Sequence, residues 1–426
     1  MNIMNGIKIS KGKELTRDKK LLFYRRPKFI YIPLISGNDK NITALVKKGD
    51  YVYKGSVVGR RKGCLSLPIF SSVSGTVVDI TSKTYLDGDT VKCIVIENDF
   101  KEKIETQPQM HEKLNDYTKS EFIKLLKEHG ICGMGGSGFP TYIKYDTDTP
   151  INTLIVNAVE CEPYITADVV LMKEKAEEIL ETIDAIMDIN GIKECFIAFK
   201  KDQKLIKLFQ DYLGTYPRIK IIIVPNLYPM GWERNLISYV KHVNYNVLPI
   251  EKGIVVNNVS TIYAIYEALK LNKPLIERIV TFTGEMLKRP QNVYVKVGTP
   301  IKEIIAGLEG YKRNKDVILV AGGPMMGSSL VDDDFVVTPN LNCILILKNN
   351  LKEEELNCLR CGRCVKNCPS HLSPVLIKDK INNIDDLKCL HPEKCVECGL
   401  CSYVCPSKIK VRKYVQEAKQ KVKEVK

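Results

Sequence analysis

Eight cysteines occur in two copies of one spacing, and no other feature restricts the fold of this chain as strongly. The first copy precedes Pro369 and the second precedes Pro406, so C-x2-C-x2-C-x3-C-P occurs twice. This is the bacterial pattern for a pair of [4Fe–4S] clusters, in which the fourth cysteine of each copy ligates the other cluster. We therefore expect two crossed ligand sets, which are Cys358, Cys361, Cys364 and Cys405, and Cys395, Cys398, Cys401 and Cys368.

Zinc sites and disulfides are the alternative uses of these cysteines. Zinc also binds thiolates in C-x2-C pairs, but a zinc ribbon separates two such pairs by a longer loop. Disulfides need an oxidising compartment. The lysines near the N-terminus precede no apolar signal segment, so we expect a cytoplasmic protein with reduced thiols. Cys389 lies outside the two sets and is either a reactive thiol or an ordinary cysteine.

The net charge of +14 is concentrated at the two ends of the chain. Residues 1–28 hold nine lysines and arginines against two acids, and residues 407–426 hold eight against two. No basic stripe with interleaved aromatic residues lies between them, so we expect no nucleic-acid binding. No apolar run is long enough to span a bilayer, so we expect no direct membrane insertion. We interpret the basic ends as solvated tails, with docking onto an acidic redox partner as the alternative.

The length of 426 residues predicts several domains. Between residues 30 and 98, short β-rich runs alternate with glycine-containing turns. Strand patterns at 153–157, 195–199 and 219–224 alternate with helical patterns, which predicts an α/β domain with a parallel sheet. Later residues mix strands with helices, and the chain closes on a lysine-rich helix. The predicted fold class is a multidomain protein of mixed α/β and α+β type.

A glycine-rich stretch, GMGGSGFP at residues 133–140, follows a helical pattern. Glycines let the backbone approach a phosphate or a flat ring closely, and exposed N–H groups favour an anion there. No Gly-Lys-Ser/Thr follows, so this is not a Walker loop, and the preceding helix argues against the usual dinucleotide-binding motif. On its own, the stretch predicts either an anion-binding loop or an ordinary tight turn.

The order GMGGSGFPTYIK, VNAVECEP, NNVST and two ferredoxin-type cysteine sets resembles the flavin- and NADH-binding subunit of respiratory complex I. This resemblance implies FMN as a cofactor and NADH as the electron donor. It assigns the FMN phosphate and ribityl chain to the glycine loop and Lys144. It assigns the flavin to Asn157 and Asn258, and the nicotinamide side to Glu160 and Glu162. The matching cofactor positions are Gly133, Gly135, Gly136, Gly138, Phe139, Lys144, Asn157, Glu160, Glu162, Asn258 and Thr261.

The chain as a whole resembles RnfC-type proteins more closely, because their four parts occur here in the same order. VKKGDYVYKGSVVG resembles a barrel-sandwich carrier module, although Lys62 lacks the flanking sequence of a cofactor-bearing lysine. We therefore expect a structural module at that position. The resemblance implies a basic segment (1–29), a barrel-sandwich hybrid (30–100), an FMN/NADH-binding domain (115–245), a β-grasp domain of SLBB type (246–345), a helical ferredoxin-type domain with two [4Fe–4S] clusters (350–410) and a lysine-rich helix (411–426).

These resemblances imply an electron-transfer oxidoreductase in which electrons pass from NADH through FMN and two clusters to a partner protein. The segments YPMGWERNL and HPEKCVECGLCSYVCPS resemble a subgroup associated with D-proline reductase in amino-acid-fermenting clostridia. A D-proline reductase-type enzyme is therefore the first expected partner. The membrane subunits of an ion-translocating ferredoxin:NAD oxidoreductase of Rnf type are the alternative, and they would place the chain at the membrane periphery.

Two departures from the complex I pattern lie in the acidic turn AVECEP, residues 158–163. Val159 stands where complex I has Asp, and Cys161 stands where it has Gly. We interpret Cys161 as a packing residue or a neighbour of the flavin. The departures also motivate a third hypothesis, in which the chain is a cluster-bearing adaptor without nucleotide binding.

Overall fold

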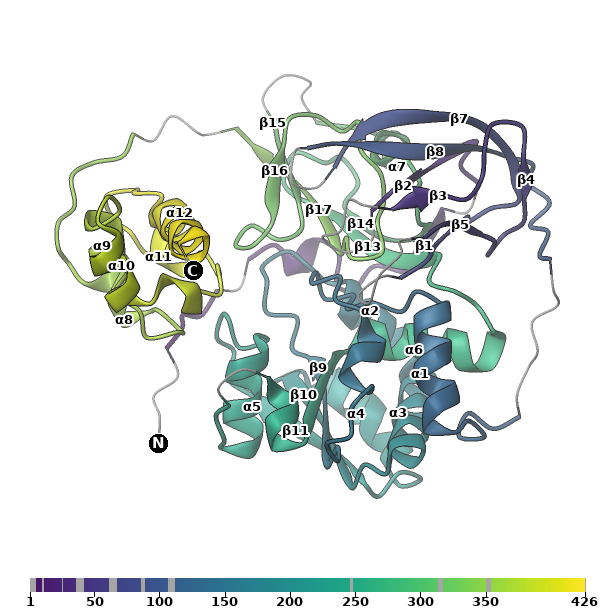
Figure 1. The fold of residues 1–426 in the computed structure, drawn as a ribbon, viewed down its shortest axis with the longest axis horizontal. Helices are drawn as coiled ribbons and strands as arrows, with labels where there is room; N and C mark the ends of the chain where they lie inside the picture. Colours follow the sequence, from purple (N-terminus) through teal and green to yellow (C-terminus); the bar gives the residue numbers. More distant parts are fainter. Residues whose placement is uncertain are drawn as a thin grey trace.

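The computed structural model describes residues 5–9, 11–24, 26–35, 42–60, 67–85, 89–105, 112–245, 248–312, 317–349 and 354–425. An α/β unit forms one half of the main body, β-rich units form the other half, and a small helical unit stands to one side (Figure 1). Within these ranges, every helix is too short or too polar to cross a bilayer.

The first β-rich unit is an antiparallel sandwich. Its four-stranded sheet has the order β2-β8-β7-β4, with β2 (Phe29–Pro33), β4 (Tyr51–Val52), β7 (Gly75–Thr84) and β8 (Thr90–Asn98). Its second sheet contains β3 (Thr43–Ala44), β5 (Val57–Arg60) and β6 (Ile69–Phe70). Alternate residues of the strands, such as Ile30, Ile32, Ile94 and Ile96, point inward and are buried, as expected for sheets with one solvated face. Lys62 lies outside the described residues.

The α/β unit has a parallel sheet in the order β11-β10-β9-β12. Its strands are β9 (Thr153–Ala158), β10 (Glu194–Lys200), β11 (Ile219–Val224) and β12 (Ile254–Asn258). Its helices are α1 (Lys119–Glu128), α2 (Ala167–Glu174), α3 (Ala176–Asn190), α4 (Gln203–Leu213), α5 (Glu233–Lys241) and α6 (Val259–Leu271), with short helices η2 (Thr141–Lys144) and η3 (Pro249–Lys252). The near-continuous apolar strands fit burial on both faces.

The predicted boundary after residue 245 is wrong for this unit. Strand β12 pairs with β9 along five residues, from Ile254 opposite Thr153 to Asn258 opposite Asn157. Helix α6 then packs back onto the unit through buried residues such as Ile262 and Ile265. The α/β unit therefore continues through α6, because β9 would otherwise expose an unpaired edge.

The second β-rich unit, called the β-grasp sheet below, is a mixed six-stranded sheet covered by α7 (Ile301–Gly307). Its order is β1-β14-β13-β17-β15-β16. The strands are β1 (Leu22–Tyr24), β13 (Glu277–Thr283), β14 (Gln291–Lys296), β15 (Val317–Ala321), β16 (Ser328–Leu330) and β17 (Cys343–Lys348).

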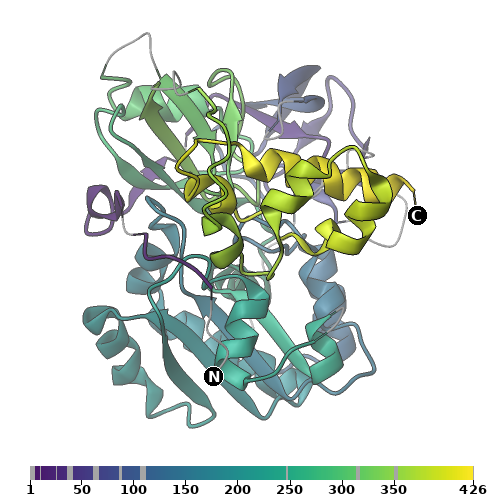
Figure 2. The same cartoon turned by 90° about the vertical axis from the view of Figure 1, so that its left-hand side faces the viewer.

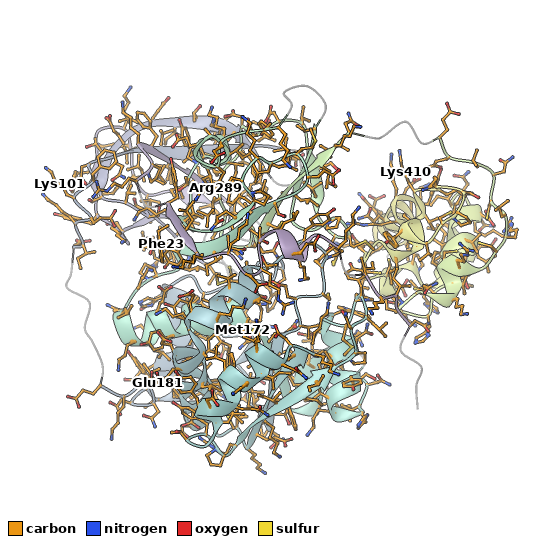
Figure 3. The ribbon with its side chains drawn as sticks, turned by 180° about the vertical axis from the view of Figure 1, so that it is seen from behind. Phe23, Lys101, Met172, Glu181, Arg289 and Lys410 are labelled. Atoms are coloured by element: carbon orange, nitrogen blue, oxygen red, sulfur yellow. The ribbon has the colours of Figure 1, made fainter. Side chains whose placement is uncertain are left out.

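The basic N-terminal segment is part of this architecture, so the expectation of a solvated tail is wrong there. Strand β1 pairs in parallel with β14, and Figure 3 shows its Phe23 at the border of the β-rich half. Upstream, η1 (Lys13–Leu15) packs against the α/β unit, and Arg17 forms an ion pair with Asp202. Two of its cations pair with acids of the α/β unit, Lys13 with Glu160 and Arg17 with Asp202.

The helical unit holds both cysteine sets. It comprises α8 (Arg363–Lys366), α9 (Pro374–Asp379), α10 (Ile384–Leu390), η4 (Pro392–Lys394), α11 (Leu400–Tyr403) and α12 (Val411–Glu424). Figure 2 shows α12 lying along the other helices of the unit. Its apolar stripe is buried in the core of the unit, and Lys419 and Lys421 donate to the carbonyls of Cys395 and Ile381, so this end is not a free tail either. The stripe consists of Val411, Val415, Ala418 and Val422.

Replacing Ile377 with Ala is expected to destabilise the helical unit by about 2–5 kcal/mol, because the fully buried side chain would leave a cavity. Its neighbour Leu376 is 44% exposed and provides the matched control. The measurement is the urea midpoint for loss of visible cluster absorbance in each variant. Equal midpoints for Ile377→Ala and Leu376→Ala would show that this packing does not support the clusters.

Candidate functional site

A cavity of about 600 Å³ opens between the α/β unit, the β-grasp sheet and the helical unit. This volume lies in the range of cofactor pockets. Nine of the eleven positions predicted to bind a cofactor line the cavity. They are Gly133, Gly135, Gly136, Lys144, Asn157, Glu160, Glu162, Asn258 and Thr261.

The topology of the sheet places this cavity where α/β folds bind ligands. The chain runs outward from β9 to β10 and β11, then returns to the other side of β9 with β12. Such a reversal of strand order opens a crevice at the carboxyl ends of the two central strands. Asn157 and Asn258 stand opposite each other at those ends and both line the cavity.

The glycine loop is held against the start of α6. The backbone N–H of Met134 donates to Thr261 Oγ1 at 3.0 Å, which fixes the loop over the end of β12. Gly136 has φ +113°, and a Cβ there would meet nothing within 4 Å, so its backbone is open to the cavity. An L side chain would strain this conformation. The loop is therefore built for close approach of a ligand to the backbone.

Gly138 and Phe139 do not line this cavity. The Gly138 N–H donates to the carbonyl of Gly133 at 2.9 Å, and its φ of +62° closes the loop. Phe139 is 42% exposed. These two residues shape the turn, and the structure gives them no direct place at the site.

Lys144 supplies a cation to the cavity that the protein only partly neutralises. Its Nζ donates to the carbonyl of Val256 at 2.6 Å and lies 3.8 Å from a carboxylate oxygen of Glu233. Burial lowers the pKa of Lys144, because desolvation disfavours the charged form. A phosphate beside Nζ would offset that cost. The cavity size, the open glycine backbone and this cation together fit a flavin mononucleotide.

Glu160 is buried within a network that motif reasoning did not find. Its Oε2 accepts from Lys13 Nζ at 3.2 Å, and its Oε1 accepts from the backbone N–H of Asp168 at 2.8 Å. Lys13 also donates to the carbonyl of Ile165 at 2.5 Å. Burial raises the pKa of Glu160 to about 7, and the nearby Lys13 opposes this shift. No local motif marks Lys13, because it reaches the site from the N-terminal segment.

Asp168 is the second residue that sequence reasoning missed. Asn258 Nδ2 donates to one of its carboxylate oxygens at 2.7 Å, and Ser260 Oγ donates to the other at 2.5 Å. Asp168 lines the cavity and orients the amide of Asn258. Its position at the start of α2, after the acidic turn, was the available signal.

Glu162 joins the cavity to the β-grasp sheet. Its two oxygens accept the backbone N–H groups of Met325 at 3.2 Å and Met326 at 2.9 Å. Burial raises the pKa of Glu162 to about 7. A Cβ at Gly323 would clash with the side chain of Glu162, so a larger residue there would displace the carboxylate. Glu162 therefore binds the loop of residues 322–327 in addition to lining the cavity.

The two departures from the complex I pattern have different surroundings. Val159 is 3% exposed and packs with residues of the α/β core, so it does not face the cavity. Cys161 lines the cavity below Gly231, where an added Cβ would stand 3.1 Å from Cys161 Sγ. Burial raises the pKa of Cys161, so the thiol form is favoured.

The eight motif cysteines are gathered around two separate hollows of the helical unit. Cys358, Cys361, Cys364 and Cys405 line one hollow, and Cys368, Cys395, Cys398 and Cys401 line the other. In the described part of the chain, no three His, Cys, Asp or Glu side chains converge on a point suited to a single metal ion. Each hollow thus collects the four cysteines of one expected crossed set. Cys389 is exposed and lines neither hollow.

The second hollow adjoins the large cavity. Cys398 and Val396 line both spaces. Tyr228, which also lines the cavity, donates from Oη to the carbonyl of Cys398 at 2.7 Å. Cys361 of the other set is exposed. The three spaces therefore follow one another in the order large cavity, hollow of the second cysteine set and hollow of the first cysteine set.

Family models match all four parts of the chain. The RnfC barrel sandwich hybrid domain matches residues 1–101, and the Nuo51 FMN-binding domain matches residues 126–267. The SLBB domain matches residues 279–328, and the 4Fe-4S dicluster domain matches residues 357–409. The second range includes β12 and most of α6, in agreement with the observed sheet.

Solved structures share the fold at low sequence identity. The NAD+-reducing [NiFe]-hydrogenase in its H2-reduced state aligns with a TM-score of 0.51 at 15% identity, covering 71% of this chain and 63% of the hydrogenase chain. The air-oxidised state aligns with a TM-score of 0.52 over 73% of this chain and 64% of that chain.

Two curated relatives match over most of their own length, and both carry the designation C within their complexes. The one from the Na(+)-translocating ferredoxin:NAD(+) oxidoreductase complex of Acetobacterium woodii is 32% identical over 381 residues, covering 88% of this chain and 86% of that protein. The one from the proton-translocating complex of Clostridium ljungdahlii is 32% identical over 380 residues, covering 87% and 82%. With its domains in the same order, this chain belongs to the RnfC family of electron-transfer flavo-iron–sulfur proteins.

Proposed function

We propose that this chain is the subunit of an Rnf-type ferredoxin:NAD oxidoreductase that exchanges electrons with NADH. Bound FMN would supply the step between a two-electron hydride donor and one-electron carriers. The observation that carries the proposal is the shared wall formed by Cys398 and Val396, which puts the second cysteine set beside the cavity with the flavin-type residues.

Different residues of the cavity would bind different parts of FMN and of the nicotinamide nucleotide. Lys144 and the N–H groups of the glycine loop would hold the phosphate, because both present positive charge to an anion. Asn157 and Asn258 would hold the flavin ring system, with Asp168 fixing the Asn258 amide. Glu160 and Glu162 already accept hydrogen bonds from protein groups, and each carboxylate keeps lone pairs for a ribose hydroxyl.

The partner is proposed to be the membrane part of an Rnf-type complex. The relatives that match most of this chain are subunits of ion-translocating complexes. A chain whose described helices cannot cross a bilayer would need such partners to act at a membrane.

The D-proline reductase-type partner gains no support from the relatives or the fold. One segment behind that expectation, residues 228–236, contributes Tyr228, Pro229, Gly231 and Trp232 to the cavity wall. These residues therefore have a place at the site that needs no proline reductase partner. Val159 is a packing residue, so only Cys161 remains as a reason for the adaptor hypothesis.

Purified protein reconstituted with FMN, iron and sulfide is expected to show a flavin spectrum that NADH bleaches. We expect this result because the cavity contains side chains that would bind the flavin phosphate and others that would bind a nucleotide. The measurement is anaerobic visible absorbance before and after NADH. Protein that retains no FMN, with clusters that stay oxidised in NADH, would support the adaptor hypothesis instead.

Lys144→Met is expected to weaken FMN binding by about 1.5–3 kcal/mol, the range for a hydrogen bond to a charged group. This corresponds to a Kd about ten- to hundredfold higher. Fluorescence titration of the FMN-free protein measures it. Lys124→Met is the control, because that side chain is 73% exposed on α1. An unchanged Kd in a folded Lys144→Met protein would remove this lysine from the phosphate site.

Cys358→Ala and Cys368→Ala are expected to damage different clusters, although both residues belong to the first motif copy. Their side chains line different hollows. Electron paramagnetic resonance of the dithionite-reduced variants separates the two signals. Loss of the same signal in both variants would rule out the crossed sets.

A further inference from the structure

The hollow of the first cysteine set lies next to an exposed apolar surface. Cys361 is exposed, and the neighbouring Leu359, which also lines the hollow, is 69% exposed. Leu356 is 65% exposed and is fixed to the hollow by its N–H, which donates to the carbonyl of Ser407 at 3.0 Å. Two large exposed leucines beside a redox centre form a small apolar patch that a docked partner would cover.

Exposed charged residues flank these leucines, because Glu354 and Glu355 precede Leu356 and basic residues follow Leu359. Arg360, Arg363 and Lys366 follow Leu359 along the chain and are exposed. Lys378 lines the same hollow from α9. The acid beside this group, Asp379, is occupied by ion pairs with Arg360 and Lys378. The surface thus combines an apolar centre with a positive rim on the side of Leu359, while the two acids lie on the side of Leu356.

Lysines and arginines also outnumber acids in the helical unit, although two oxidised [4Fe–4S] clusters with their eight thiolates would offset most of this excess, so the local basic group beside Leu359 carries the argument. Residues 354–425 contain 14 lysines and arginines against 9 aspartates and glutamates. A positive field over the exit of an electron path favours encounter with a negatively charged protein and raises its association rate. The unit also stands to one side of the main body, where a partner has access (Figures 1 and 2).

We propose that Leu356, Leu359, Arg360, Arg363 and Lys366 form the docking surface for an acidic one-electron redox protein. This proposal rests on the proposed function, since it takes the first cluster as the exit of the path. One electron leaves the reduced first cluster and reduces the centre of the docked protein by one electron. No bond forms or breaks, and the reverse transfer uses the same surface.

The test uses the full-length holoprotein and an acidic bacterial two-[4Fe–4S] ferredoxin as the probe. NAD+ reduction by dithionite-free, photoreduced ferredoxin is followed at low salt. The double variant Arg363→Glu/Lys366→Glu reverses two charges three residues apart on α8. Lys204→Glu/Lys207→Glu is the matched control, with the same charge change and spacing on the exposed face of α4.

The first double variant is expected to raise the KM for ferredoxin about tenfold, as expected for loss of electrostatic steering. The control is expected to leave it unchanged. Both are expected to keep the wild-type rate of ferricyanide reduction by NADH, which reports the flavin site. Leu359→Ser, which removes an exposed apolar contact without a charge change, is expected to raise the same KM with less salt dependence.

Equal effects of the two double variants on the KM would overturn the proposal, because they would show that the net charge of the protein matters and the position of the charges does not. A wild-type dimer in sedimentation that Arg363→Glu/Lys366→Glu dissociates would also overturn it, since the surface would then bind a second copy. Failure of the proposed function is a different result, in which the wild-type holoprotein itself does not reduce ferricyanide with NADH.

Discussion

The arrangement of the three units around the cavity depends on one short loop, residues 322–327 of the β-grasp sheet. Glu162 of the α/β unit accepts the N–H groups of Met325 and Met326, and Arg412 of α12 donates to the Met325 carbonyl at 2.9 Å. Gly399 lies against the same carbonyl, and a Cβ there would come within 2.6 Å of it. The loop is therefore bound from both sides, and the second cysteine set is held beside the cavity as a result.

The N-terminal segment reinforces this junction. The N–H of Ile7 donates to the Tyr228 carbonyl at 3.1 Å, and Asn5 Nδ2 donates to the Cys368 carbonyl at 3.0 Å. Further along, Lys13 neutralises Glu160. One segment thus contacts the second cysteine set, the wall of the cavity and a buried carboxylate. Because a charge buried without its partner is costly, Lys13 and Glu160 stabilise the site only as a pair.

Sequence reasoning identified what is local and missed what depends on packing. Cysteine spacing predicted the grouping around two hollows, because ligand geometry is encoded within a few residues. The glycine loop and the ends of β9 and β12 were found by motifs of the same kind. Lys13 and β12 were misassigned, because the first comes to the site from 147 residues away and the second joins the sheet beyond an expected boundary. Counting charges along the sequence could not distinguish a solvated basic tail from a packed basic segment that forms ion pairs with acids of other units.

The central claim is that electrons pass between the cavity and the first cluster by way of the second cysteine set. Rapid-freeze electron paramagnetic resonance after mixing with NADH tests it in the two single-cluster variants. In Cys358→Ala, the remaining cluster adjoins the cavity and is expected to be reduced as fast as in the wild type. In Cys368→Ala, the remaining cluster is expected to stay oxidised over the same interval. Equally fast reduction of the remaining cluster in both variants would contradict the account.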